Sequence, residues 1–309
     1  MIALILRRVL AGVAVMWVAA TLTFAALRGV RGDPVAAVVG SGALVTPEVR
    51  AQIVSEYGFD QPLVVQYLRW LSRLVSGDLG WSYQLGQPVT EVLRGQLGPT
   101  AELAIAATIT AVLAAVVLAL LTAGRGRTTR SLASMAELSA ASVPTFWLGL
   151  VALTFFSFRW QLFPATGAGS LSALILPAVV LAVPVAGVLT QVLREGLETA
   201  LAQPFALSVR MRGIGPVALI GRHALRHACI ALATMTGWVL GSLFGGAVLT
   251  ETVFARPGLG RVLLSAIASR DLPVVTAVVL LVAAAFTVIN LLVDLAYLAI
   301  DPRLRRRTG

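Results

Sequence analysis

The chain has 309 residues, of which 58% are hydrophobic and only 12% are charged, and its mean hydropathy is +0.89. Soluble proteins carry about a quarter charged residues, so the composition excludes an ordinary soluble domain and indicates a polytopic membrane protein. The formal charge of +10 comes from 24 basic residues, all arginine. They lie at the ends of apolar runs, which favours membrane topology over nucleic-acid binding. A single cysteine, Cys229, excludes an internal disulfide framework.

Six apolar runs are long enough to cross about 30 Å of hydrocarbon as helices. The first follows Arg7-Arg8 and is too long for a signal peptide, so it is expected to stay as an uncleaved helix. The predicted spans are Val9–Leu27, Leu103–Thr122, Leu138–Phe158, Leu174–Leu193, Ala228–Leu249 and Pro273–Ala299.

The arginines predict the orientation of these spans. With the N-terminus in the cytoplasm, 14 of the 24 arginines fall inside and the short outside loops hold only four. Short loops with the larger share of arginine stay in the cytoplasm, so both termini are expected there.

The segment between the first two spans, residues 28–102, is too long for a simple turn. Thr46-Pro47-Glu48 has the pattern of a helix start, and Gly58 fits the end of that helix. Leu63–Val75 is predicted to be an amphipathic helix with aromatic side chains suited to a membrane interface. We expect a small external subdomain, which either caps the helix bundle or handles substrate.

Proline and one carboxylate mark the third and fourth spans. Pro144 lies inside the third span, and Pro177 and Pro184 are expected to interrupt the fourth. Glu137 lies at the inner end of the third span. A carboxylate within a membrane can belong to a proton relay, but this one is expected near the water interface, which argues against that role.

The segment Arg194–Ala228 lies between the fourth and fifth spans and contains a short helix with marked ends. Pro204 fits the first helical position, because its φ is already helical and its missing N–H would have no partner there. Gly213 fits a left-handed residue after the helix end, followed by the Gly215-Pro216 break. A second helix is expected from about Val217.

Two interpretations of this segment are open. Phe205 and Val209 share one face of the short helix, and Arg210 and Arg212 stand near its end. A capped helix between two spans suits the docking of a soluble partner. The alternative is a solvated loop whose arginines only set the orientation.

The last two spans carry a small-residue stripe and a polar stripe. Gly237, Gly241 and Gly245 recur every four residues, which allows another helix to approach closely, within one subunit or along a translocation path. Residues 251–260, which begin with Glu251, are expected to form an external loop. Asn290, Asp294, Tyr297 and Asp301 fall on one face of the last helix, which either lies against neighbouring helices or lines a wet path.

Enzymatic signatures are absent from the sequence. A phosphate-binding P-loop needs a lysine, and the chain has none. His223 and His227 are its only histidines, and no HExxH pattern or third ligand accompanies them, so we expect no metal site. The chain is predicted not to be an enzyme and to bind no cofactor.

Several motifs agree with one family in order and spacing. They are Gly32-Asp33-Pro34, Gly77-Asp78-Leu79-Gly80-x-Ser82, Pro144-x-Phe146-Trp147, Arg222-His223-Ala224-Leu225-Arg226, Glu251-x2-Phe254-x2-Pro257-Gly258-x-Gly260, Arg270-Asp271-x-Pro273, Asn290-Leu291-x2-Asp294-x2-Tyr297 and Asp301-Pro302-Arg303. In these stretches the chain resembles the B-type transmembrane permease subunit of bacterial dipeptide/oligopeptide ABC importers.

The resemblance implies an all-α protein of the type I ABC importer kind in the bacterial cytoplasmic membrane, with six transmembrane helices and an external subdomain after the first. The domains would be a first helix 1–27, an external subdomain 28–102, a five-helix core 103–299 containing a coupling loop 194–227, and a cytoplasmic tail 300–309. The implied partners are a C-type permease, ATPase subunits that carry ATP and Mg²⁺, an external solute-binding protein and membrane lipids, but no nucleic acid.

The resemblance also implies roles for particular residues. The ATPase-coupling residues would be Pro204, Phe205, Val209, Arg210, Arg212, Gly213, Arg222 and His223. Those of the translocation path or of helix packing would be Gly237, Gly241, Gly245, Glu251, Asn290 and Asp294.

The expected function is translocation of di- or oligopeptides, driven by ATP hydrolysis on separate subunits. Alternatives are an importer of the same family for nickel, glutathione or haem, or, in a different class, a membrane scaffold or signalling subunit. A secondary transporter would need ionisable residues near the middle of the bilayer, whereas the polar residues of this chain are expected near the ends of the spans, which argues against that class.

Overall fold

The computed structural model describes residues 2–29, 33–39 and 45–300, and in these ranges the chain is helical without a strand. Two of the helical segments, η1 and η2, have the wider π-helical turn. In chain order the segments are α1 (Ile2–Gly29), α2 (Pro34–Val39), α3 (Pro47–Tyr57), α4 (Leu63–Val75), α5 (Val89–Thr122), α6 (Arg127–Ser142), α7 (Thr145–Ala152), η1 (Leu153–Arg159), α8 (Leu171–Leu201), α9 (Pro204–Met211), α10 (Pro216–Ala218), η2 (Leu219–Ala224), α11 (Leu225–Val253), α12 (Leu259–Ala268) and α13 (Leu272–Ile300).

Four described helices are long and apolar enough to cross a membrane: Leu6–Ala26 in α1, Val89–Thr122, Leu171–Leu201 and Leu272–Val293 in α13. A bent pair of helices gives a fifth candidate. The predicted fifth span lies within α11, a helix of 29 residues. Several side chains between residues 230 and 242 lie outside the described part, so a total of six spans stays a prediction.

The third predicted span, Leu138–Phe158, is wrong as one straight helix. Two helical pieces, Arg127–Ser142 and Thr145–Arg159, meet at an angle of 93°. Val143, at the break, has ψ near 128°, the extended conformation that a following proline imposes on its neighbour. Pro144 therefore ends α6 and redirects the chain, where the sequence alone suggested a proline inside a continuous span.

The prediction that prolines interrupt the fourth span is also wrong. α8 runs unbroken from Leu171 to Leu201 with Pro177 and Pro184 inside it. Both prolines lie among buried residues of this helix or next to them, and neighbouring helices can satisfy the carbonyls that they free.

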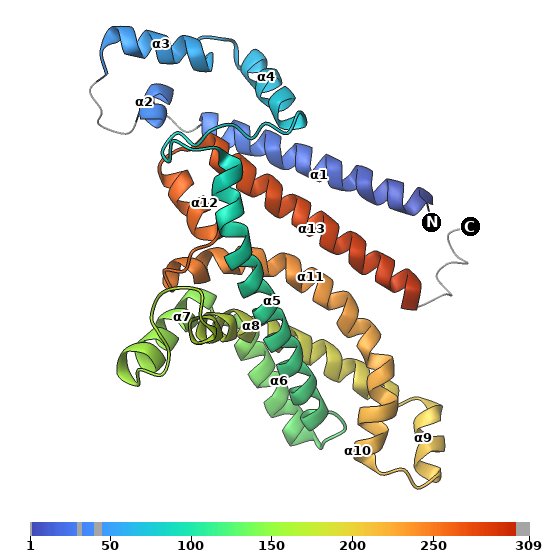
Figure 1. Ribbon diagram of the computed structural model, residues 1–309. Helices are drawn as coiled ribbons and strands as arrows, with labels where there is room; N and C mark the ends of the chain where they lie inside the picture. Colours follow the sequence, from blue (N-terminus) through green and yellow to red (C-terminus); the bar gives the residue numbers. More distant parts are fainter. Residues whose placement is uncertain (1, 30–32, 40–44, 301–309) are drawn as a thin grey trace. The chain divides into compact units, whose positions relative to one another are not determined.

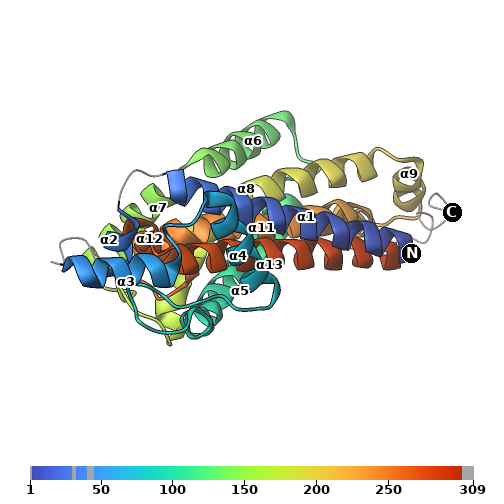
Figure 2. The same ribbon diagram turned by 90° about the horizontal axis from the view of Figure 1, so that it is seen from above.

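The chain forms two compact units, residues 1–98 with 258–287 and residues 99–257 with 288–309. In the second unit α8 packs against both α6 and α11 (Figures 1 and 2). Its core joins large side chains of α8 with a stripe of alanines, four residues apart, that begins on α5. The stripe consists of Ala107, Ala111, Ala115, Ala119 and Ala123, all at most 1% exposed. Small residues at this spacing let helices approach closely.

In the first unit aromatic side chains fasten α4 to α1. The ring of Phe24 lies 5.4 Å from that of Tyr67 and 5.2 Å from that of Trp70, and the Tyr67 hydroxyl lies 2.8 Å from that of Thr21. Five other apolar side chains of α4 are exposed, as expected for a helix at a membrane interface, namely Leu63, Val64, Val65, Leu68 and Val75. The predicted start and end of α3 are confirmed, because Thr46 accepts the Val49 N–H and Gly58 has φ +65°.

Polar contacts fix the loop that follows α4. Ser82 donates a buried hydrogen bond of 2.5 Å to Asp271, which lies between α12 and α13.

An ion pair joins the residue before α2 to α3. Asp33 pairs with Arg50 through two hydrogen bonds of 2.6 and 3.0 Å, and this guanidinium holds the pKa of the Asp33 carboxyl below its usual range.

Candidate functional site

The segment between α8 and α11 holds a short helix whose ends agree with the sequence prediction. α9 begins at Pro204, after Gln203 in an extended conformation, and ends at Met211. Gly213 has φ +77°, a left-handed conformation in which no neighbouring atom would contact an added Cβ. The chain resumes as α10 at Pro216, close to the predicted restart. α9 and α10 lie at one end of the second unit (Figure 1).

One face of α9 is held by the protein's own core. Ala206 is 1% exposed, and the half-buried Phe205 packs against the core of the second unit. The Phe205 ring lies 4.9 Å from the imidazole of His227 at the start of α11. Phe205 therefore anchors α9 to its own chain, and Val209 is half-buried on the same side.

The other face of α9 exposes large apolar side chains. Leu207 is 64% exposed and Met211 is 82% exposed, and Val217 on α10 is also 82% exposed. The sequence analysis did not single out Leu207 or Val217. The sequence did carry a signal for Leu207, since Leu207 and Met211 are four residues apart and therefore lie on one face of the helix. We call Leu207, Met211 and Val217 the apolar knob.

The predicted basic residues of this segment form no ion pairs among the described residues. Arg210, Arg212 and Arg222 are exposed to solvent. His223 is half-buried in η2, where its Nδ1 lies 3.4 Å from the carbonyl oxygen of Ala218. Arg210 and Arg212 are the sequence neighbours of Met211, and we call these two exposed cations the cationic rim of the knob.

A buried ion pair joins α8 to α6 shortly before α8 leads into α9. Arg194 is 3% exposed, and it donates to Glu137 through Nε at 2.9 Å and Nη2 at 2.7 Å. Nη2 also donates to the Ser134 hydroxyl at 2.9 Å. Glu198 lies 3.4 Å from Arg194 and pairs with the exposed Arg130 at 2.5 Å. We call this group of residues the polar joint: Arg130, Ser134, Glu137, Arg194 and Glu198.

The side chain of Glu137 is buried within the protein and both of its oxygens accept from Arg194, while its expected place near the membrane–water interface stays a prediction. A two-pronged guanidinium–carboxylate pair fixes distance and angle between the two helices. Its place beside α9 suits a rigid mechanical connection.

The backbones of α6 and α8 approach closely at Gly187, which the sequence analysis did not single out. A Cβ at this position would lie 2.6 Å from the backbone oxygen of Glu137 and 3.1 Å from the backbone nitrogen of Ala141. Backbone atoms cannot swing aside, so only glycine allows this approach.

The predicted glycine stripe of α11 has a mixed outcome. At Gly245 an added Cβ would meet nothing within 4 Å, whereas at the next residue, Gly246, it would lie 2.7 Å from Leu181 on α8. Within this chain the close approach therefore falls on Gly246. Gly241 is half-buried, and the surroundings of Gly237 lie outside the described part.

The predicted loop at residues 251–260 begins later than expected. Glu251 belongs to the last turn of α11, is fully buried, and accepts the Thr100 hydroxyl at 2.6 Å. Arg256, 1% exposed, donates to Glu102 at 2.5 Å. Buried polar groups with partners favour helix packing as the role of this region.

The polar stripe of the last span is described only in part. Asn290 is half-buried on α13. The side chains of Asp294 and Tyr297, and the whole of Asp301, lie outside the described residues. Their predicted role stays a prediction.

Comparison with known proteins places these features in a family. Residues 111–306 match the family described as binding-protein-dependent transport system inner membrane component, and residues 1–104 match the N-terminal region of such membrane components. The chain belongs to this family. The two matches cover residues 1–104 and 111–306, and members of this family are membrane transport components rather than enzymes.

Relatives match over the full length of the chain. A protein from Brucella abortus (strain 2308) that carries the name of a peptide transport system permease is 37% identical over 99% of both chains. A protein of Sinorhizobium fredii named as a peptide ABC transporter permease is 36% identical over 97% of this chain and 98% of its own. The glutathione transport system permease GsiC of Salmonella typhimurium is 33% identical over 97% and 98%.

Proposed function

We propose that this chain is the permease subunit through which an ABC importer moves short peptides across the bacterial cytoplasmic membrane. ATP hydrolysis takes place on separate subunits, and α9 is the element that they drive. The names of the relatives from Brucella and Sinorhizobium support peptides as the substrate class, and the name of GsiC keeps glutathione, itself a peptide, within that class.

The apolar knob is the observation that carries the coupling proposal. Leu207 and Met211 are exposed beyond 60% on α9, which the core holds from behind through Phe205, and Val217 is exposed to 82% on the neighbouring α10. Exposed large apolar side chains gathered on one surface mark a protein-binding site, and the cationic rim suits a partner with carboxylates. A groove on a cytoplasmic ATPase is the occupant that we assign.

The complete importer in this proposal has two permeases, this chain and a C-type homologue, besides the ATPases and an external solute-binding protein. The polar joint gives the coupling a physical route. Movement of α9 pulls directly on α8, and the pair of Arg194 with Glu137 carries that movement to α6.

A charge placed in the knob should uncouple the importer. Met211→Glu puts a carboxylate where apolar contact with the ATPase is expected, and loss of one such contact costs at least about 1–2 kcal/mol, or roughly tenfold in affinity. We expect peptide uptake by the reconstituted importer to fall roughly tenfold, with ATPase subunits lost on purification. Val75→Glu is the matched control, since Val75 is also 82% exposed but lies on α4. Equal loss of ATPase subunits in both variants would contradict the assignment of the knob.

Phe205→Ala should act by another route. It removes the side chain that anchors α9 to the core and to His227, which leaves the knob intact but loosely held. We expect the ATPases to stay bound while binding protein loaded with peptide no longer stimulates hydrolysis. Normal stimulation in this variant, measured as phosphate release, would show that the anchoring face is not needed.

The orientation can be tested with single cysteines in a Cys229→Ser background. Ser55 and Thr128 are both exposed, and the arginine distribution puts Ser55 outside and Thr128 inside. Ser55→Cys should react with an impermeant thiol reagent in intact cells or spheroplasts, and Thr128→Cys only after lysis. Reaction of both in intact cells would overturn the topology.

A further inference from the structure

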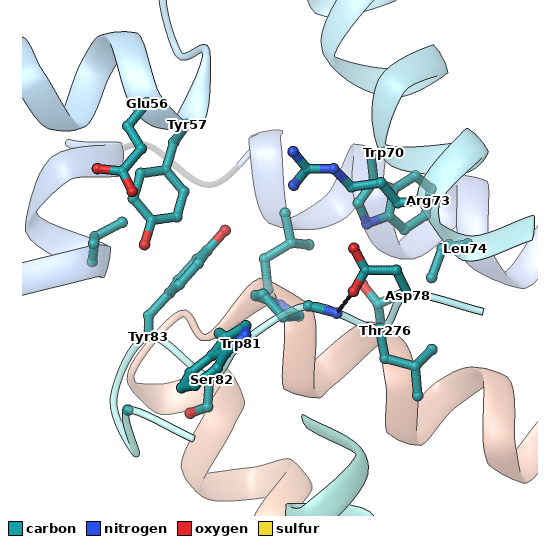
Figure 3. Close-up of a pocket in the computed structure, with 16 residues that line it drawn as sticks. Glu56, Tyr57, Trp70, Arg73, Leu74, Asp78, Trp81, Ser82, Tyr83 and Thr276 are labelled. Carbon is teal, nitrogen blue, oxygen red and sulfur yellow. Dashed lines mark hydrogen bonds between the residues drawn. The ribbon is translucent and has the colours of Figure 1, made fainter. Parts of the chain in front are cut away.

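The first unit contains a cavity of about 640 Å³ that the coupling proposal does not use. Its walls come from α3, α4, the loop that follows α4 and the first turns of α13 (Figure 3). Cavities of about 300–1,000 Å³ are the usual size of small-molecule sites. This one is large enough for a ligand of a few amino-acid residues.

Charged side chains lie on two sides of the cavity. Figure 3 shows Glu56 on one side and Arg73 with Asp78 on the other. Asp78 already accepts the Gly80 N–H at 2.9 Å, whereas the described residues include no ion-pair partner for Glu56 or Arg73. A carboxylate and a guanidinium are thus both available within one cavity.

Aromatic rings cover the space between these charges. Tyr57, Trp81 and Tyr83 line it, and the rings of Tyr57 and Tyr83 stand nearly perpendicular at 87° with their centroids 5.5 Å apart. Burial raises the pKa of Tyr83 to about 12, so its hydroxyl keeps its proton at neutral pH and can donate a hydrogen bond. Such rings offer apolar area with a polar edge.

One buried polar group in the wall has no partner. Thr276, on α13, is 1% exposed, and its Oγ1 has no hydrogen-bond partner among the described residues. A buried hydroxyl without a partner costs free energy unless a ligand satisfies it. This group lies in the same wall as the charged and aromatic residues.

We propose that this cavity is a binding site for short zwitterionic peptides on the permease itself, with Glu56 holding the ammonium and Arg73 the carboxylate. Apolar side chains of the peptide lie on the aromatic rings. This inference rests on the proposed function and adds to it a site that recognises free peptide ends, independent of the solute-binding protein. A purely apolar ligand would leave both charges unused, and a nucleotide would meet the carboxylate of Glu56.

The test uses the complete importer in nanodiscs without its solute-binding protein. Three probes are compared by equilibrium binding: a radiolabelled Ala-Phe-Ala tripeptide, its N-acetylated form and its C-amidated form. Loss of one charge-assisted hydrogen bond typically weakens binding roughly tenfold or more. Arg73→Gln should therefore weaken the free tripeptide about tenfold and the C-amidated form hardly at all. Glu56→Gln should weaken binding of the free tripeptide about tenfold and change binding of the N-acetylated form hardly at all.

Matched controls are Arg69→Gln, one turn before Arg73 on α4, and Glu48→Gln on α3, since neither residue lines the cavity. Both should bind all three probes as the unchanged protein does. Absence of saturable binding of the free tripeptide to the unchanged protein would overturn the proposal. An equal loss of binding for all three probes in Arg73→Gln or Glu56→Gln would overturn it too. If Arg73→Gln left peptide binding unchanged but abolished docking of the solute-binding protein, the cavity would belong to a segment of that protein, and the proposal would again fail.

Uptake is measured on the same preparation after the solute-binding protein is added. An importer that takes up the tripeptide but does not bind it alone refutes only the cavity site. An importer that binds the tripeptide but never transports it refutes the proposed function instead.

Discussion

Replacing Arg194 with methionine is expected to destabilise the protein by about 3–5 kcal/mol, because it leaves the buried Glu137 carboxylate without its partner. Both oxygens of Glu137 now accept from Arg194, and the variant removes both bonds at once. The loss should appear as a large fall in the midpoint of thermal unfolding in detergent, together with lower yield from membranes.

Two further variants separate the loss of the pair from general damage. Arg194→Met combined with Glu137→Met should recover most of the stability, because no charge remains buried. Arg130→Met is the matched control: this arginine pairs with Glu198 but is 58% exposed, so the change should cost no more than about 1 kcal/mol. If the double variant is as unstable as the single one, the loss in the single variant does not come from a lone buried carboxylate, which would contradict this explanation.

Gly187→Ala is expected to cost about 1–3 kcal/mol although it adds a single methyl group. The new Cβ would lie 2.6 Å from a backbone oxygen of α6, so the two helices must separate. This penalty exceeds the gain of up to about 1 kcal/mol that alanine brings to a helix interior. Thermal unfolding of the purified chain measures the net effect.

Gly245→Ala is the matched control, because nothing lies within 4 Å of its added Cβ. The same measurement should show no loss, or a gain of a few tenths of a kcal/mol or more from helix propensity. If Gly245→Ala instead prevents assembly with the partner permease, the predicted glycine stripe packs between subunits. Equal stability of both alanine variants would contradict the close α6–α8 contact.

Features set by neighbouring residues could be predicted from the sequence. Pro204 and Gly213 delimit α9 because one has a fixed φ and the other takes a left-handed conformation at no steric cost. Thr46 and Gly58 delimit α3 for related reasons. Pro144 carried the signal for the 93° break, and its effect on Val143 was underestimated.

Features that depend on distant residues could not be predicted. Glu137 and Arg194 are 57 residues apart, and no local pattern indicates that they pair. Small-residue stripes occur on both α5 and α11, and spacing alone does not tell which stripe another helix will cover. In this structure the alanine stripe of α5 is buried while Gly245 faces open space, because the position of α8 decides both.

The separation of Glu137 and Arg194 also bears on how the protein is made. At roughly 5–20 residues per second, a ribosome adds the 57 residues between them in about 3–11 s. During that interval Glu137 is already part of the nascent chain and its counter-charge has not yet been made. A lone carboxylate is costly in lipid. We therefore expect α6 to settle in the membrane only after α8 has followed it, so that the two helices insert together.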